Sequence, residues 1–314
     1  MAHDKTILHK NLCKKSIDMI REPIILGTEE KEMEKIIYTL IDDIHRTLEQ
    51  GVELNDDVQA AIDEASNSIR YALMDAVRDG REDRPNNLRM SMIGKPDRQI
   101  WYTLRDDKPE QIDGQTRIKF LQGHLLEAVI IALAKIAGHS VTEQQEKHEV
   151  EGIKGHQDCR IDGTLVDIKT ASSFGFKKFR DGADALADDD PFGYTAQISS
   201  YATAQNDEEV AFLAIDKSSC EMALCYLYKE HLIDAPKRIS HLKKVVKQET
   251  PPERCYEPVA DGQSGNMKLA TGCNYCRFKM DCWSDVGLRA FQYSNGVRYF
   301  THIEKEPNVE EIQL

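Results

Sequence analysis

The pattern of apolar and polar positions divides the chain into a helical N-terminal part and a later part with strands. Between about Ile17 and Asp79, apolar residues recur at helical spacing, as in EMEKIIYTLIDDIHRTLEQ, with no strand-like alternation. The stretch REDRPNNLR, which contains Pro85 and two asparagines, breaks this pattern. We therefore predict a helical N-terminal region over residues 1–88 and a main domain over residues 89–250.

A strong apolar stripe marks a long helix in the main domain. Between Leu121 and Ala137 its members recur with a period near 3.6, and Gly138 then supplies a helix terminator. The stripe consists of Leu125, Leu126, Val129, Ile130, Leu133, Ile136 and Ala137. Three segments with strand character follow, roughly Val141–Val150, Lys154–Ile161 and Thr164–Ala171. Asp162-Gly163 separates the last two and suits a two-residue hairpin turn, because this dipeptide tolerates positive φ.

A second helix and two more strands complete the predicted order. The helix spans roughly Thr195–Ala204, and the runs EVAFLAID and MALCYLYK have the apolar and aromatic enrichment of strands. The order helix, three antiparallel strands, helix and strand, with one further strand appended, predicts an α/β domain with a mixed sheet. Residues 251–314 form a cysteine-rich C-terminal segment, whose end from about Glu304 is acidic, as is typical of a mobile tail.

The predicted hairpin brings charged residues to one face. With Asp162-Gly163 as the turn, Asp158 lies directly opposite Asp167, and Lys169 projects to the same side because side chains alternate along a strand. Like charges opposite each other destabilise a sheet unless Lys169 neutralises them or a cation sits between the carboxylates, and a divalent ion would resolve the conflict. Carboxylate oxygens suit Mg²⁺ or Mn²⁺, which can polarise a phosphodiester and activate water. The alternative is an ordinary surface ion pair, since Asp-x-Lys is a common tripeptide.

The two predicted helices offer further candidate residues. Glu127 lies on the flank of the apolar stripe and can reach the sheet edge as a third carboxylate, with His124 one turn earlier as a rival ligand. A solvated or capping histidine is the alternative for His124. Gln197 and Tyr201 share a helix face at i and i+4 and could contact phosphate or stack on a base. Helix packing is the alternative for these two.

Composition limits the classes of partner. The chain has 314 residues, 40% of them hydrophobic, which is enough for a sizeable core. A formal net charge of −13 argues against binding nucleic acid through a general positive field, so any such contact must be local or metal-assisted. No apolar run approaches the ~20 residues that span a bilayer, and the start MAHDKTILHK lacks a secretory signal, so we expect a cytoplasmic protein. Two local basic groups, with solvated surface as the alternative, are Lys177, Lys178 and Arg180, and Lys243, Lys244 and Lys247.

Eight cysteines in an intracellular chain do not predict a disulfide framework. Most are scattered, but three in the C-terminal segment are clustered as a metal site would be: Cys273, Cys276 and Cys282. Reduced cysteines without metal are the alternative. The scattered ones include Cys13, Cys159, Cys220 and Cys225.

Four motifs together resemble the PD-(D/E)xK nucleases of the RecB and lambda-exonuclease type, over roughly residues 90–230. They are Gly123-x-x-x-Glu127, Gly155-His156-Gln157-Asp158, Asp167-Ile168-Lys169-Thr170 and Gln197-x-x-x-Tyr201. The resemblance implies a restriction-endonuclease-like core and a metal held by Glu127 or His124, Asp158, Asp167 and the Ile168 backbone carbonyl. It implies that Lys169 acts on the attacking water. Gln197 and Tyr201 would face the substrate.

A second resemblance concerns the cysteines. The segment Arg89–Tyr102 is similar to the lead-in of RecB-like nucleases with an iron–sulfur cluster, in which a cysteine commonly precedes the arginine by two positions. In this chain Pro96 stands two positions before Arg98, although Cys273-x2-Cys276-x5-Cys282 matches the downstream pattern of that family. Cys255 is the nearest substitute for the fourth ligand, and Cys13 is the less favoured candidate. Four thiolates could hold a [4Fe–4S] cluster or Zn²⁺, and spacing does not choose between them.

The sequence therefore predicts a metal-dependent DNA nuclease, with exonuclease favoured over endonuclease, similar to exonucleases encoded by bacteriophages. DNA is the expected substrate, recombination or replication proteins are candidate partners, and the location is the cytoplasm, that of the host for a phage protein. A non-catalytic module that binds DNA ends or partner proteins on the same fold is the alternative. A structural or redox protein built around the cysteines is a third hypothesis.

Overall fold

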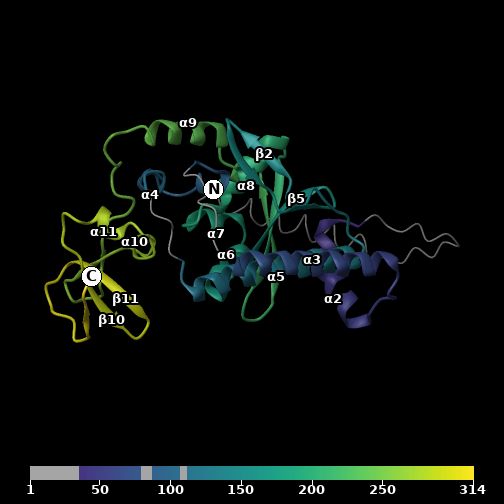
Figure 1. Ribbon diagram of the computed structural model, residues 1–314, viewed down its shortest axis with the longest axis horizontal. Coiled ribbons are helices and arrows are strands. Elements are labelled where there is room, and N and C mark those ends of the chain that lie inside the picture. The colour runs from purple at the N-terminus through teal and green to yellow at the C-terminus, as the bar shows by residue number, and fades with distance from the viewer. Residues whose placement is uncertain (1–34, 79–86, 107–111) are drawn as a thin grey trace, which may run out of the picture. The chain divides into compact units, whose positions relative to one another are not determined.

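The computed structural model describes residues 35–78, 87–106 and 112–314, and Lys35–Leu314 forms one compact unit (Figure 1). The part of the predicted helical region before residue 35 lies outside the described residues, as does Cys13. Asn55 begins the longest helix of this region by accepting a hydrogen bond from Val58 N at 2.9 Å. The prediction of helices is confirmed from residue 35 by η1 (Ile37–Thr39), α2 (Leu40–Gln50) and α3 (Asp56–Val77).

Helix α5 (Gly114–Ile136) is the helix predicted from the apolar stripe, and α3 runs beside it (Figure 1). Gly138, with φ of 87°, follows its end as predicted. The predicted burial is wrong at Val129, which is 40% exposed, whereas alanines such as Ala128 and Ala132 are buried. The reason is that α5 packs against α3 as well as the sheet, and small side chains let two helices approach closely. Among the residues that the structure describes, no helix is both long and apolar enough to cross a bilayer.

A five-stranded mixed sheet forms the centre of the main domain, which confirms the α/β prediction. The parallel pair in its middle is flanked by antiparallel neighbours on both sides. Its order is β1 (Val141–Thr142), β4 (Cys159–Ile161), β5 (Thr164–Ala171), β6 (Glu209–Asp216) and β7 (Met222–Tyr228). The helices that follow β5 and β7 are α6 (Ser173–Asp181), α7 (Ala183–Asp188), α8 (Tyr194–Gln205) and, after the short η3 (Lys229–His231), α9 (Ala235–Val245).

Both faces of the sheet are covered, so β5 is buried on both sides. Val166 and Ile168 pack with residues of α2 and α5, whereas Leu165 packs with residues of α6, α8 and α9. A strand covered on both faces reads as a nearly continuous apolar run, and Leu165, Val166 and Ile168 form such a run with one interruption. A charged residue between them, Asp167, is therefore placed in the interior of the domain.

The hairpin turn is confirmed, but the two strands predicted before it are each broken. Asp162 and Gly163 have φ of 48° and 82°, as a two-residue turn requires. Positive φ at Glu143 and Gln145 ends β1 early, and a separate ribbon then forms. That ribbon pairs β2 (Lys147–Val150) with β3 (Ile153–His156). The predicted segments Val141–Val150 and Lys154–Ile161 are thus divided between the sheet and the ribbon.

The lead-in segment consists of a 3-10 helix, η2 (Met90–Met92), and a short helix, α4 (Asp97–Thr103). Between them, Gly94 lies against Gly193, the residue before α8: a Cβ added at Gly94 would lie 2.3 Å from the Cα of Gly193. No side chain fits in that gap. The two segments are therefore joined backbone to backbone.

The C-terminal segment has a sheet of its own, which the sequence did not predict. Its order is β12 (Glu311–Ile312), β10 (Arg289–Tyr293), β11 (Gly296–His302), β9 (Met267–Lys268) and β8 (Val259–Ala260), with the short helices α10 (Thr271–Asn274) and α11 (Lys279–Cys282). The prediction of a mobile acidic tail from Glu304 is wrong, because β12 pairs with β10. The guanidinium of Arg289 bridges Glu306 and Glu311 and neutralises this part of the tail.

Candidate active site

Two of the predicted site residues lie on β5. Asp167 is 1% exposed, and its Oδ2 forms an ion pair with the ammonium of Lys169, two residues along the same face. Within the part of the chain that the structure describes, Oδ2 of Asp167 makes no hydrogen bond of good geometry beyond this ion pair. The strand thus carries a buried carboxylate and its counter-charge to the α8 side of the sheet.

Asp158 approaches the same place from the loop before β4. The predicted register is confirmed along β4, where Cys159 faces Val166, but the pairing ends there, one residue short of the predicted pair Asp158 and Asp167. The Asp158 carboxylate instead accepts a hydrogen bond from Ile168 N at 2.8 Å. This bond fixes Asp158 on β5 through its side chain. The role predicted for the carbonyl of Ile168 remains a prediction.

Glu127 reaches the site from α5. Its Oε1 accepts a hydrogen bond from Gln145 Nε2 at 3.1 Å, and its side chain is 22% exposed. His124, its predicted rival, has a side chain that is 66% exposed, and its Nδ1 lies 4.0 Å from Oε2 of Glu127. Glu127 is therefore the residue that faces inward. His124 lies on the outer side.

The charges of these four groups act on one another's pKa values. Burial raises the pKa of Asp167 to about 7, with Lys169 opposing, and raises the pKa of Asp158 to about 6. Burial, followed by the charge of Asp167, also raises the pKa of Glu127. Burial would lower the pKa of Lys169, but Asp167 and Asp158 outweigh it and hold that pKa above its usual range. Three carboxyl groups therefore compete for one ammonium, an arrangement that added positive charge would stabilise.

Gln197 and Tyr201 lie on α8, with Gln197 Nε2 3.4 Å from the Tyr201 hydroxyl oxygen. Tyr201 is 2% exposed and packs against Gly155, where an added Cβ would lie 2.9 Å from the tyrosine ring. A ring this buried offers no face to a base, and Tyr201 packs in the core, as the helix-packing alternative expects. Burial raises the pKa of Tyr201 to about 12, so its hydroxyl stays protonated near neutral pH.

The sequence reasoning missed two residues of this site. Tyr194, the first residue of α8, has its ring centroid 5.4 Å from Lys169 Nζ, and Gln145 bonds to Glu127. Burial raises the pKa of Tyr194. A signal for Tyr194 was available, because Tyr194, Gln197 and Tyr201 follow one helix face at i, i+3 and i+7. No local pattern marks Gln145, whose contact depends on the broken strand β1.

The two basic groups are partly neutralised by acidic neighbours. Lys178 Nζ donates to the backbone oxygen of Asp189 at 3.0 Å and pairs with its carboxylate. Lys243 Nζ lies 3.8 Å from Oε2 of Glu151. Within each group, part of the positive charge is therefore balanced by a neighbouring acid.

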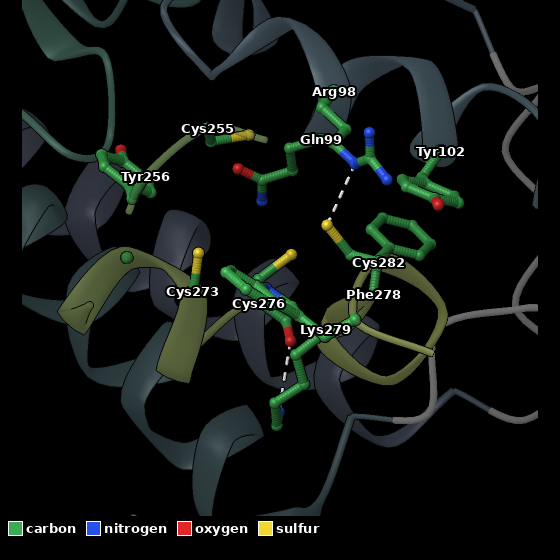
Figure 2. A pocket seen from close by; sticks show the side chains of 12 residues that line it. Arg98, Gln99, Tyr102, Cys255, Tyr256, Cys273, Cys276, Phe278, Lys279 and Cys282 are labelled. Atoms are coloured by element: carbon green, nitrogen blue, oxygen red, sulfur yellow. Dashed lines mark hydrogen bonds between the residues drawn. The ribbon is translucent and has the colours of Figure 1, made fainter. Parts of the chain in front are cut away.

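Four cysteines line one pocket, which holds about 360 Å³ of empty space, part of it open to solvent. Figure 2 shows three of them on the α10–α11 segment and Cys255 on the loop before β8. Arg98 of α4 donates from Nε to the Cys282 sulfur at 3.0 Å and so connects this pocket to the lead-in segment. The four are Cys255, Cys273, Cys276 and Cys282.

Burial keeps three of these thiols, those of Cys255, Cys273 and Cys276, in their protonated form. It raises the pKa of Cys273 to about 11, with the neighbouring thiols adding to the effect, and it also raises the pKa values of Cys255 and Cys276. Metal binding would therefore have to displace protons. In residues 35–78, 87–106 and 112–314, no three His, Cys, Asp or Glu side chains are close enough together to hold one metal ion as they stand. At both places the donor types fit a metal, and the donors would have to draw together around it.

Comparison with known proteins gives distant likenesses only. No protein-family model and no curated protein matches the sequence. A solved structure named SSO0001 is 15% identical, with a TM-score of 0.41, and the match covers 71% of this chain and 96% of that chain. An alkaline exonuclease from Laribacter hongkongensis is 15% identical, with a TM-score of 0.34, covering 52% and 85%. A phage-related exonuclease from Haemophilus somnus 129PT is 16% identical, with a TM-score of 0.28, covering 68% and 93%. Likenesses this distant assign no activity, so function rests on the site.

Proposed function

We propose that the protein is a Mg²⁺- or Mn²⁺-dependent deoxyribonuclease, acting from DNA ends in preference to internal sites. The observation that supports this most is the mutual electrostatic influence of Glu127, Asp158, Asp167 and Lys169, which come from α5, the loop before β4 and β5. Burying three carboxyl groups beside one ammonium is costly to the fold. A binding site for a divalent cation and a phosphodiester would explain why the fold carries this cost.

Each residue has a role in this proposal. Glu127, Asp158 and Asp167 hold the metal, together with the carbonyl of Ile168, and the bound ion would polarise the scissile phosphodiester and lower the pKa of a water. The hydrogen bond from Ile168 N keeps one Asp158 oxygen fixed and leaves the other for the metal. Lys169 orients the attacking water or the scissile phosphate. Gln197 faces the substrate, and the buried Tyr201 hydroxyl holds Gln197 in place by accepting its hydrogen bond.

The charge of the chain agrees with a metal-assisted contact. With a net charge of −13, and with Lys178 and Lys243 each paired with an acid, the protein attracts DNA weakly by its general field. The metal and Lys169 then supply the local positive charge. We propose DNA as the substrate, recombination or replication proteins as partners, and the cytoplasm as the location.

We propose that Cys255, Cys273, Cys276 and Cys282 hold a [4Fe–4S] cluster or Zn²⁺. Their lining of one pocket supports a shared ligand, and Cys255 supplies the fourth thiol that the sequence left open. Arg98, bonded to Cys282, joins this ligand set to α4. The metal would hold the C-terminal segment on the nuclease core and take no part in hydrolysis.

The test is digestion of end-labelled linear DNA and closed circular DNA with Mg²⁺ or Mn²⁺. We expect the linear DNA to be degraded, the circle to survive, and EDTA to stop the reaction. Lys169→Ala should reduce the rate by ~100-fold or more, because a group that acts on the attacking water or phosphate is lost. Lys154→Ala, at an exposed lysine of β3, is the matched control and should keep full activity. Full activity of a folded Lys169→Ala protein would reject the assignment.

A non-catalytic DNA-binding module is the second candidate function. One observation favours it: among the described residues, the acidic groups are not gathered closely enough to share one ion. Tight binding of DNA ends in EDTA, with no cleavage of linear DNA by the purified protein under any metal, would select this function. Cleavage that needs Mg²⁺ or Mn²⁺ would exclude it.

A further inference from the structure

An aromatic column runs from the core of the domain to its surface beside Lys169. Phe212, on β6, is fully buried, and the ring of Phe179 packs on it with centroids 5.4 Å apart. Tyr194 follows at 5.9 Å from Phe179, and Phe192 stacks on Tyr194 with centroids 5.4 Å apart and an angle of 27° between the rings. Phe192 ends the column with 63% of its surface exposed.

The backbone that carries Phe192 is fixed on both sides. The Asp190 carboxylate accepts hydrogen bonds from Tyr194 N at 2.9 Å and from Thr195 N at 2.8 Å. Gly193 N donates to the backbone oxygen of Asp190 at 3.2 Å, and Gly193 lies directly against Gly94. An exposed aromatic side chain on a fixed backbone loses little conformational entropy when a ligand covers it.

The column lies within reach of the proposed scissile phosphate. Tyr194 contacts both Phe192 and Lys169: its ring centroid lies 5.4 Å from that of Phe192 and 5.4 Å from Nζ of Lys169. A stacked strand rises ~3.4 Å per nucleotide, so the ring of Phe192 can meet a base within about three nucleotides of that phosphate. A flat aromatic face accepts any base, because every base has a π-face.

We propose that Phe192 is a stacking platform for an unpaired nucleobase of the DNA strand that enters the active site. This inference rests on the proposed nuclease function and deepens it, because it makes a single-stranded end the preferred substrate. The base would continue the column of Phe212, Phe179, Tyr194 and Phe192. Within a duplex each base is stacked between its neighbours and tied to the complementary strand, so a duplex end would have to fray before a base near the end could turn its face to the ring.

The kinetic test uses single-stranded oligothymidylate of about 12 nucleotides and four proteins: wild type, Phe192→Ala, Phe192→Leu and Phe192→Trp. We expect Ala and Leu to raise KM about 10-fold and to change kcat less than about 2-fold, since stacking on one ring is worth roughly that factor. Leu keeps the apolar packing on Tyr194 but has no aromatic face. Trp should restore the wild-type KM. Wild-type KM in the Leu variant, or equal losses of kcat and stability in all three variants, would overturn the platform.

Two further arms make the result specific. An abasic site within about three nucleotides of the digested end should raise KM for the wild type but add little for Phe192→Ala, because base and ring act as one pair. Equal penalties in both proteins would contradict the inference. Tyr71→Ala, at a tyrosine of α3 that is 67% exposed, is the matched control and should leave KM unchanged.

A binding measurement separates this inference from the proposed function. The Phe192→Trp protein is mixed with oligothymidylate in EDTA, and its fluorescence is compared with that of the wild type, which has two tryptophans of its own. Quenching that only the variant shows supports the platform even if the wild type cleaves no DNA with any metal. Cleavage by the wild type without such quenching keeps the nuclease and rejects the platform.

Discussion

At the scale of single residues, the site depends on the absence of a side chain at Gly155. An added Cβ there would lie 2.8 Å from the Met90 Cβ and 2.9 Å from the ring of Tyr201, both of which are buried. Such contacts force neighbours to move, because interiors are closely packed. Gly155 therefore lets Tyr201 stand close to the carboxylates.

Gly155→Ala should lower the free energy of unfolding by about 1–3 kcal/mol and displace Tyr201, reducing the proposed nuclease activity. Urea denaturation and the digestion assay measure the two effects. Gly123→Ala, at a glycine within α5, is the matched control. Its Cβ would lie 3.6 Å from Oγ1 of Thr170, which is an ordinary contact distance. We expect this control to gain about 0.5–1 kcal/mol, as alanine favours a helix. Equal effects of the two substitutions would contradict the packing argument.

The carboxyl groups of the site predict how stability depends on pH without metal. Burial raises the pKa values of Asp158 to about 6 and Asp167 to about 7, so the fold binds these protons more tightly than the unfolded chain does. This contribution to stability is complete below the unfolded pKa values and is lost as pH rises through about 6 to 7. In EDTA, the wild type should therefore lose stability between about pH 5 and pH 7.5.

Asp167→Asn removes one of these titrations and should flatten the loss, which urea denaturation at both pH values measures. Asp181→Asn, at an exposed aspartate of α6, is the control and should keep the wild-type slope. Added Mg²⁺ should restore stability to the wild type at the higher pH, because the metal favours the ionised carboxylates. Parallel slopes for wild type and Asp167→Asn would refute the proposed origin of the pH dependence.

At the scale of elements, a buried histidine joins the N-terminal helices to the active-site hairpin. His139 Nδ1 lies 2.6 Å from Oδ2 of Asp162 in the hairpin turn, and its Nε2 lies 3.3 Å from Oδ2 of Asp43 on α2. Asp162 also accepts a hydrogen bond from Ser140 N at 3.0 Å. The turn that sets the register of β4 and β5 is thus held from outside the sheet.

His139→Ala should lower the free energy of unfolding by about 1–3 kcal/mol, because the buried carboxylate of Asp162 loses a partner. Chemical denaturation gives the value. His124→Ala is the matched control: its side chain is exposed, so we expect less than about 0.5 kcal/mol. The control also tests the metal ligands, since loss of activity in a stable His124→Ala protein would favour His124 over Glu127.

The sequence predicted those parts of the site that depend on local pattern. Asp158, Asp167 and Lys169 follow from one two-residue turn and the alternation of a strand, and both are properties of neighbouring residues. The break of the preceding strands could not be predicted, because positive φ at Glu143 and Gln145 has no glycine to mark it. The contacts of Gln145 and His139 could not be predicted either, because they depend on tertiary structure.

At the scale of the whole molecule, the C-terminal segment was the part least visible in the sequence. Three of its strands, β8, β9 and β12, have two residues each, too few to produce an alternation. Only the cysteines marked it as an ordered unit. Its small core of Leu269, Cys273, Trp283 and Leu288 explains why a metal would matter to its stability.

Cys255→Ser should remove the metal and loosen the C-terminal segment from the core. We expect loss of bound iron or zinc, measured by elemental analysis and visible absorption, and faster limited proteolysis after residue 250, while the core stays folded. A brown protein would indicate the iron–sulfur cluster and a colourless one with bound zinc would indicate Zn²⁺. Cys220→Ser, at an exposed cysteine outside the pocket, is the control. Unchanged metal content in Cys255→Ser would exclude Cys255 as a ligand.

The backbone contact between Gly94 and Gly193 limits how this protein can evolve or be recombined. Because neither position has room for a Cβ, a substitution at one cannot be rescued by a smaller residue at the other, which is already the smallest. A chimaera that takes its lead-in segment from a relative would have to bring glycine at this position, or the turn that carries Phe192 would be displaced. Inheritance of the lead-in and of the start of α8 is therefore linked.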